Sequence, residues 1–193
     1  MGWLIAGQAA AAVLYFVFTS FLIRTSGPGL FGKLNLCFVV TNLLFAFSGL
    51  WLETAAIKFS KEAVLQAGSQ RTVFWTRACL SFALMAIYMV PLFILRDLFY
   101  RYLADRDLWT LIFTAAYAFL TLAQAMIRAA LVGRGRMDRM AGMTLADRAA
   151  GLVGLLALHF IFRTEATAHI LLVLLCVSRV ISILIQISLR RTS

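Results

Sequence analysis

Apolar residues fill most of this chain in long runs, and short polar segments separate the runs. A helix needs about twenty apolar residues to cross the hydrocarbon core of a membrane. Four runs meet this requirement, at residues 3–23, 34–57, 78–95 and 108–127. The second is interrupted only by Glu53, near its end. The pattern therefore predicts four membrane-spanning helices within the first two thirds of the chain.

Two further runs carry charged residues. Residues 141–162 include Asp147 and Arg148 in their first turns, and residues 166–189 include Arg179 near the middle. The first run of the chain lacks the charged segment that opens a signal peptide and is longer than a signal-peptide core, so we interpret it as a retained span. We predict six spans in a single all-α membrane domain, residues 1–193, built as a six-helix bundle.

The composition agrees with a membrane protein. Hydrophobic residues make up 63% of the chain and charged residues 13%, which lies outside the usual range of a soluble globular domain. The net charge of +10 comes from 18 Lys and Arg against 8 Asp and Glu. In a soluble protein this surplus would indicate nucleic acid. Here the charges lie between apolar runs and form no separate basic domain, so we expect loop charge and no nucleic-acid partner.

The positions of the basic residues predict the orientation. With a cytoplasmic N-terminus, the inner loops and tail hold eleven Lys and Arg: Lys58, Lys61, Arg71, Arg77, Arg128, Arg134, Arg136, Arg139, Arg148, Arg190 and Arg191. The outer loops hold six: Arg24, Lys33, Arg96, Arg101, Arg106 and Arg163. Cytoplasmic loops of membrane proteins are enriched in Lys and Arg. We therefore expect both termini in the cytoplasm and the segment 96–107 as an outer loop.

Polar residues inside four of the spans align on one helical face each, at about 100° per residue. In the fourth span this face holds Thr110, Thr114, Tyr117, Thr121, Gln124 and Arg128. In the second span it holds Asn35, Asn42, Ala46, Gly49, Glu53 and Ala56. The sixth span contributes Arg179, Ser182, Gln186 and Arg190, and the first contributes Gln8, Ala12, Tyr15 and Thr19.

Two interpretations of these faces stay open. Small and hydroxylated residues let helices approach closely, and we favour such packing for the first span and for Gly151 and Gly154 of the fifth. Arginine is not needed for packing, and it is costly at mid-membrane. For the fourth and sixth spans we therefore expect a water-filled cationic cavity. Arg179 lies about 15 Å from either end of its span, too deep to reach the surface easily, and is the main candidate to contact an anionic substrate.

Other reactive residues give weaker signals. Glu53 and Asp147 lie near the cytoplasmic ends of their spans, where salt bridges with Arg128 or Arg148 explain them. His159 and His169 lack a carboxylate partner, so we expect no metal site. The cysteines Cys37, Cys79 and Cys176 are predicted to be buried free thiols. The segment "GRGRMDR" lacks the preceding strand and the Gly-Lys-Ser/Thr ending of a phosphate loop. We expect neither an enzyme nor a cofactor.

Three segments carry a resemblance to a known family. In "GQAAAAVLYFVFTSFLIRTSGPGLFGKLNL", a first span ends in Arg24 before the turn formed by Gly27, Pro28, Phe31 and Gly32. In "SGLWLETAAIKFSKEA", Gly49, Leu50, Ala55 and Ala56 precede Lys58. The third segment, "RAALVGRGRMDRMA", is a basic turn between spans four and five. These segments resemble the multidrug/oligosaccharidyl-lipid/polysaccharide (MOP) flippase superfamily.

Within that superfamily the chain is most similar to bacterial polysaccharide exporters of the O-antigen type, which serve lipopolysaccharide biosynthesis. The eukaryotic Rft family, associated with dolichol-linked oligosaccharides, shares the "GQ", "LIR" and Pro-x-x-Phe-Gly features. Gly27 before Pro28 and the "GRGR" turn favour the bacterial family.

The resemblance implies a flippase in the bacterial inner membrane. Such a protein moves an undecaprenyl-pyrophosphate-linked glycan to the outer leaflet by alternating access, while the lipid tail stays in the bilayer. A cationic cavity would offset part of the dehydration of the pyrophosphate, and arginine can hold two phosphate oxygens at once. The candidate substrate-binding residues are Arg179, Arg128, Gln124, Thr121, Tyr117, Asn42, Glu53 and Arg24.

The chain departs from the family in length. Family members have twelve or more spans in two lobes, and this chain resembles the N-terminal lobe alone. A homodimer, a separately encoded C-terminal lobe and a truncated chain without transport activity all remain open. Two other functions stay open as well: a non-transporting scaffold or accessory subunit of a glycan-assembly complex, and a small multidrug or metabolite exporter.

Overall fold

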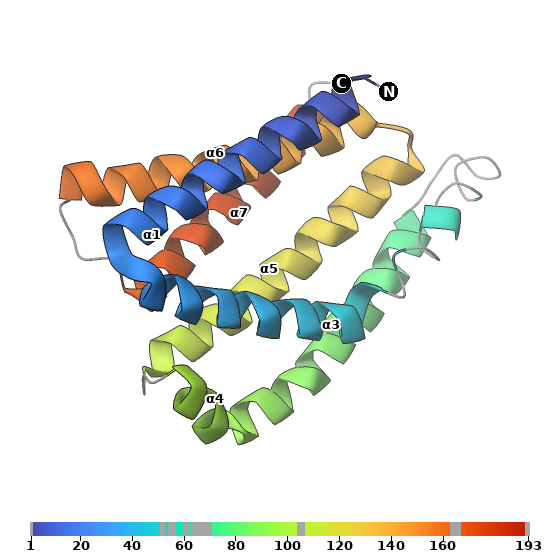
Figure 1. Cartoon of the computed structure of the whole chain (residues 1–193). Coiled ribbons are helices and arrows are strands. Elements are labelled where there is room, and N and C mark those ends of the chain that lie inside the picture. The colour runs from blue at the N-terminus through green and yellow to red at the C-terminus, as the bar shows by residue number, and fades with distance from the viewer. Residues whose placement is uncertain are drawn as a thin grey trace. The chain divides into compact units, whose positions relative to one another are not determined.

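The computed structural model describes residues 2–50, 53, 57–59, 62, 71–103, 107–162 and 167–191, and this part of the chain is helical and contains no strand. The elements follow in the order α1 (Gly2–Phe45), the π-helical turn η1 (Ala46–Leu50), α3 (Arg71–Ile94), α4 (Arg96–Leu103), α5 (Leu108–Gly133), α6 (Met137–Ala157), the π-helical turn η2 (Leu158–Phe162) and α7 (Ala168–Arg191) (Figure 1). The predicted all-α class is confirmed.

Within the described residues, five helices are long and apolar enough to cross a membrane: Ile5–Gly49, Phe74–Ile94, Leu108–Gly133, Met137–Phe160 and Ala168–Ile185. These helices fit a multi-pass membrane protein. Each of the last four lies on one of the last four predicted spans. The first predicted span and residues 34–49 of the second fall together in Ile5–Gly49, so the predicted number of six stays a prediction.

A kink at Gly27 divides α1. Gly27 has φ 81° and ψ 163°, and the helix resumes at Pro28 (Figure 1). Proline suits the first position of a helix because it has no N–H to leave unpaired and its φ is already helical. The 44 residues of α1 would extend about 66 Å without the kink, roughly twice the thickness of a hydrocarbon core. The Gly-Pro sequence therefore makes a kink between two helical segments, where the sequence pattern predicted a turn.

The segment 96–107, which we predicted as a loop, begins with helix α4. Asp97 lies in the first turn of α4 and Arg101 in its last, positions that favour these charges in the field of the helix. Phe99 is buried, whereas Arg96 and Asp97 are exposed. A short amphipathic helix can lie within a loop between two spans, so the predicted outer loop stays a prediction. Eight residues are too few to give a clear helical period, and the sequence pattern alone did not indicate α4.

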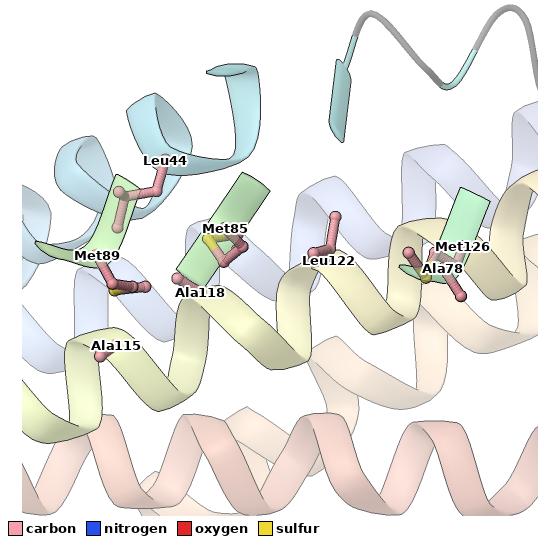
Figure 2. Packing of buried hydrophobic residues seen from close by; sticks show 8 residues of the cluster. All are labelled: Leu44, Ala78, Met85, Met89, Ala115, Ala118, Leu122 and Met126. Atoms are coloured by element: carbon pink, nitrogen blue, oxygen red, sulfur yellow. The ribbon is translucent and has the colours of Figure 1, made fainter. Parts of the chain in front are cut away.

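The chain divides into two compact units, one formed by Met1–Cys37 with Asp138–Ser193 and the other by Phe38–Met137. In the second unit, the end of α1, η1, α3 and α5 enclose a hydrophobic core. Its buried residues are Leu44, Ala78, Met85, Met89, Ala115, Ala118, Leu122 and Met126 (Figure 2). Alanines on α5 face methionines on α3, and the flexible Met side chains fill the space that the alanines leave.

The turn η1 packs closely into this core. Ser48 is fully buried, and its hydroxyl donates to the Leu44 carbonyl at 2.6 Å. A Cβ added at Gly49 would lie 2.8 Å from Cδ1 of Leu122, so only glycine fits there without a shift of its neighbour. The predicted small-residue face of the second span is therefore a packing surface at Gly49.

The first unit packs the N-terminal part of α1 with α6 and α7. A Cβ added at Gly7 would lie 2.8 Å from the Cβ of Ala141, and one added at Gly154 would collide with Leu174. The Ser182 hydroxyl of α7 donates to the Met143 carbonyl of α6 at 2.9 Å. Close approach at small residues and hydrogen bonds across helices are typical of membrane helix packing. The packing interpretation of Gly154 is confirmed.

Candidate functional site

The polar face of α5 lies almost entirely within the protein. Gln124 is only 2% exposed, Thr110, Thr114 and Tyr117 are buried, and Thr121 and Arg128 are half-buried. The helical period aligns these residues along one side of α5 because three or four positions separate each from the next. Among the eight candidate residues, the structure thus brings Tyr117, Thr121, Gln124 and Arg128 onto one face.

The threonine hydroxyls of this face donate to the protein itself. Thr114 donates to the Thr110 carbonyl and Thr121 to the Tyr117 carbonyl, both at 2.7 Å. Each hydroxyl has one proton, so a threonine bonded in this way can accept from a ligand but has no proton for a phosphate oxygen. In this rotamer the Thr121 hydroxyl donates its proton to the backbone of its own helix, so an anion would need other donors.

The N-terminal end of the same face is held by a helix cap. Asp107 precedes α5 and accepts from the Trp109 amide at 3.0 Å and from the Thr110 hydroxyl at 3.1 Å. A carboxylate at this position stabilises the helix start by satisfying free N–H groups and by its charge. Farther along, the Tyr117 ring lies 5.6 Å from the ring of Phe38, centre to centre. The cap stabilises the start of α5, and the ring contact joins α5 to the C-terminal part of α1 within the second unit.

Arg179 lies in the middle of α7, in the first unit, and its side chain is 9% exposed. About 16 Å of helical rise separate it from Ala168, the start of α7. The charge interacts with Cys176, one turn earlier. One turn later, Ser182 is held by its hydrogen bond to Met143. The side chains of Gln186 and Arg190, which we predicted on the same face, lie outside the described residues.

Three other candidates are placed differently. The side chains of Arg24 and Asn42 are exposed on the surface of α1, in the first and second units respectively. Glu53 is half-buried in the second unit, where its charge attracts Arg77. Of the two acidic residues for which we expected salt bridges, Asp147 forms no ion pair with Arg148 in the described structure. The guanidinium of Arg148 lies over the ring of Tyr15 instead, 4.7 Å from its centre.

The histidines and cysteines do not gather into a site. His159 meets the ring of Phe21 edge-on at 5.3 Å. No group of three metal-ligating side chains occurs among the described residues. The three cysteines are free, and Cys79 is exposed on α3, against our expectation that all three would be buried.

Sequence reasoning missed Arg77. The sequence pattern predicts a cytoplasmic loop at Arg77, because the third apolar run begins at residue 78. The structure begins α3 at Arg71 and leaves the Arg77 side chain 6% exposed. The available signal was the apolar sequence Val73, Phe74 and Trp75 before Arg77, which continues the span toward the N-terminus.

Comparisons with known proteins give no relative from which a function could be transferred. No protein-family model matches the chain, and no characterised protein or solved structure shows significant similarity to it. The buried arginines must therefore be interpreted from their own surroundings.

Proposed function

We propose that this protein is a lipid-linked saccharide flippase, or one lobe of such a transporter. It would move a polyprenyl-pyrophosphate-linked glycan from the cytoplasmic leaflet to the outer leaflet by alternating access. The observation that carries the proposal is Arg179, a buried guanidinium in the middle of a helix long and apolar enough to cross a membrane. The resemblance to O-antigen-type flippases at Arg24, Gly27 and Pro28 supports the same function.

The energetic argument starts from the position of Arg179. An arginine at the centre of a membrane helix costs about 2.5–3.5 kcal/mol on insertion scales, so one that is retained there usually serves a function. A pyrophosphate group carries about two negative charges, and its dehydration is unfavourable unless cations and donors replace the water. The Arg179 guanidinium supplies a positive charge, and its planar fork can donate two parallel hydrogen bonds to phosphate oxygens. The polyprenyl tail needs no protein cavity, since it stays in the bilayer.

The proposal includes six crossings, with the kink at Gly27 dividing α1 into two spans, and both termini in the cytoplasm of a bacterial inner membrane. The turn after α5 would then face the cytoplasm with Arg134, Arg136 and Arg139. An impermeant maleimide should label Arg136→Cys, made in a cysteine-free background, only after the cells are opened. Labelling of intact cells would reverse the orientation.

Translocation in vesicles tests the function. The purified chain is reconstituted with a fluorescent polyprenyl-pyrophosphate glycan, and a membrane-impermeant quencher reports the fraction of headgroups on the outside. We expect Arg179→Gln to lower the initial translocation rate by about tenfold or more, because a charged hydrogen bond contributes about 1.5–3 kcal/mol. Arg101→Gln, which removes an exposed arginine from α4, is the control and should keep the wild-type rate.

Three outcomes would contradict the proposal, and a fourth would contradict its bacterial substrate. Folded Arg179→Gln protein with a wild-type rate would remove the role of the buried arginine. A wild-type protein that moves no lipid but remains bound to glycan-assembly proteins in native membranes would indicate a scaffold. Export of small molecules driven by an ion gradient, with no effect on polyprenyl lipids, would indicate a drug or metabolite exporter. Preference for dolichol-linked oligosaccharides would place the activity with the Rft family.

A further inference from the structure

Arg77 is a buried charge without hydrogen-bond partners among the described residues. It is 6% exposed, and its Nε, Nη1 and Nη2 atoms are all buried without an acceptor. Ser81, one turn later on α3, is fully buried, and its hydroxyl has no partner there either. Residues four apart lie on the same side of a helix, so these donors share one face of α3. Buried donors are nearly always satisfied, and this face therefore lacks an acceptor.

The face that carries Arg77 and Ser81 is the face that packs on η1. The Ser48 hydroxyl of η1 lies 3.8 Å from the Met85 sulfur, and the ring of Phe47 lies 5.6 Å from the ring of Tyr88, centre to centre. At 100° per residue, four residues of α3 fall within a sector of about 80°: Arg77, Ser81, Met85 and Tyr88. Arg77 and Ser81 therefore continue this contact face toward the N-terminal end of α3.

Glu53 is the charged neighbour of Arg77. Its charge attracts Arg77, but no ion pair joins the two side chains in the described structure. In Figure 2, Leu44 lies at the Met89 end of the core and Ala78 at the other end. The chain therefore runs along α3 in the opposite direction, and Glu53, three residues after η1, follows toward the Arg77 end. Glu53 is half-buried, so the site reaches the protein surface on its side.

The charges of Arg77 and Glu53 define the ligand that would fit between them. A guanidinium that is buried without a close partner is strongly unfavourable. Glu53 does not satisfy it, because no carboxylate oxygen accepts from an Arg77 nitrogen. The two charges cancel, so a purely anionic ligand would also meet the repulsion of the carboxylate. A ligand that fits both residues has a negative acceptor toward Arg77 and a positive donor toward Glu53.

We propose that Arg77, Ser81 and Glu53 bind a zwitterionic phosphoethanolamine group. The guanidinium fork of Arg77 donates two hydrogen bonds to phosphate oxygens, and the Ser81 hydroxyl donates to one of the same oxygens. The ammonium group donates to the Glu53 carboxylate. The ligand also matches the site in charge, because the negative charge of a phosphodiester and the positive charge of an ammonium cancel, as the charges of the two side chains do.

The depth of the site matches a phospholipid headgroup. Arg77 lies three residues after Phe74, the start of its candidate span. Trp75, two residues before Arg77, is 58% exposed on the helix surface, and exposed tryptophan is enriched at the interface between membrane and water. The phosphoethanolamine group belongs either to phosphatidylethanolamine in this layer or to a soluble phosphoethanolamine that enters from the water.

The site is independent of the proposed function. It rests on residues of the second unit, whereas the transport proposal rests on Arg179 in the first unit. A protein that binds phosphoethanolamine here and moves no lipid-linked glycan would contradict the transport proposal alone. A protein that moves the glycan without this binding would contradict the site alone.

Thermal unfolding of the purified full chain in a neutral detergent tests the site. The probes are phosphatidylethanolamine, phosphatidylcholine and phosphatidylglycerol with identical acyl chains, and soluble O-phosphoethanolamine. A ligand that binds only the folded protein raises the unfolding temperature with its concentration. We expect phosphatidylethanolamine to bind severalfold more tightly than the other two lipids. The trimethylammonium of phosphatidylcholine has no N–H to donate, and phosphatidylglycerol has no ammonium group.

Variants of the site distinguish a zwitterionic ligand from an anion. Arg77→Met should weaken the binding of phosphatidylethanolamine and phosphatidylglycerol by about tenfold or more. Glu53→Gln should weaken phosphatidylethanolamine severalfold and strengthen phosphatidylglycerol, because it removes the acceptor of the ammonium and the repulsion of the anion. Arg77→Lys, which loses the fork, and Ser81→Ala, which loses the hydroxyl, should each bind phosphatidylethanolamine less tightly than wild type. Arg101→Gln, on the exposed surface of α4, should change neither lipid.

The same measurements identify the source of the ligand. Stabilisation by soluble O-phosphoethanolamine supports a site open to the water, and stabilisation by phosphatidylethanolamine alone supports a headgroup site. A lower unfolding temperature for both Arg77→Met and Glu53→Gln, with unchanged response to every probe, would show an internal ion pair and overturn the proposal. Equal binding of the three lipids by the wild-type protein, or tighter binding of phosphatidylglycerol, would overturn it as well, and so would a failure of all four probes.

Discussion

Gly27 has a backbone conformation that other residues rarely adopt, with φ 81° and ψ 163°. We expect Gly27→Ala to destabilise the protein by about 1–3 kcal/mol, the usual strain for this region of backbone space. Gly29→Ala is the matched control, because Gly29 is helical, has a negative φ and has nothing within 4 Å of an added Cβ. The control should be neutral or stabilising by up to about 1 kcal/mol. Denaturant unfolding in detergent measures the free energy of unfolding of both variants. Equal changes in the two variants would contradict a strained backbone at Gly27.

Of the two buried arginines in the described structure, the sequence pattern predicted Arg179 and missed Arg77. Arg179 was evident because apolar residues flank it on both sides. Arg77 was not, because a basic residue near the end of an apolar run is compatible with both a loop and a buried position. Only the packing of α3 against its neighbours decides between them. The exposed positions of Arg24 and Asn42 have the same cause, since one helix alone does not specify which neighbour each face meets.

Helix α6 offers a test of element packing. The Cβ added at Gly7 of α1 would lie 2.8 Å from the Cβ of Ala141 in α6, and neither atom can rotate away. We expect Gly7→Ala to force the two helices apart and to destabilise the protein by about 1–3 kcal/mol. Gly142→Ala, at the position next to Ala141 in the same helix, has open space around its added Cβ. It should stabilise α6 by up to about 1 kcal/mol.

Thermal unfolding of the two variants in the same detergent gives the comparison. A lower unfolding temperature for Gly7→Ala and an unchanged or higher one for Gly142→Ala would support the close contact. The opposite order would contradict the packing of α1 on α6.

The positions of the helices were largely predictable from sequence. The third to sixth predicted spans each correspond to one apolar helix. A run of about twenty apolar residues is the length that a helix needs to cross the membrane, so the length of the run predicts the helix. The short helix α4 and the kinked continuity of α1 were not predicted. Hydropathy describes how apolar a segment is, and it does not report whether two apolar segments are joined by a loop or by a kink.

For the whole molecule, the division into two compact units could not be read from the sequence. Lipid tails are as apolar as leucine side chains, so burial alone gives little preference for one helix pairing over another, and small residues and hydrogen bonds decide instead. In this protein, Gly7 and Gly49 allow close approach of neighbouring residues, and Ser182 forms a hydrogen bond between α7 and α6. The pattern of the spans thus predicts the class of protein, whereas the packing within each unit depends on a few small and polar side chains.

We propose that the buried guanidinium of Arg179 binds the pyrophosphate of a lipid-linked glycan. Solid-state NMR can measure this contact through the dipolar coupling between ¹⁵N-labelled arginine side chains and the ³¹P nuclei of a polyprenyl pyrophosphate in bilayers. We expect the arginine nitrogens to dephase the pyrophosphate signal at hydrogen-bonding distance. Arg179→Gln should reduce this dephasing, and Arg101→Gln should leave it intact. A pyrophosphate signal without dephasing, or with equal dephasing in wild type and Arg179→Gln, would contradict the proposed contact.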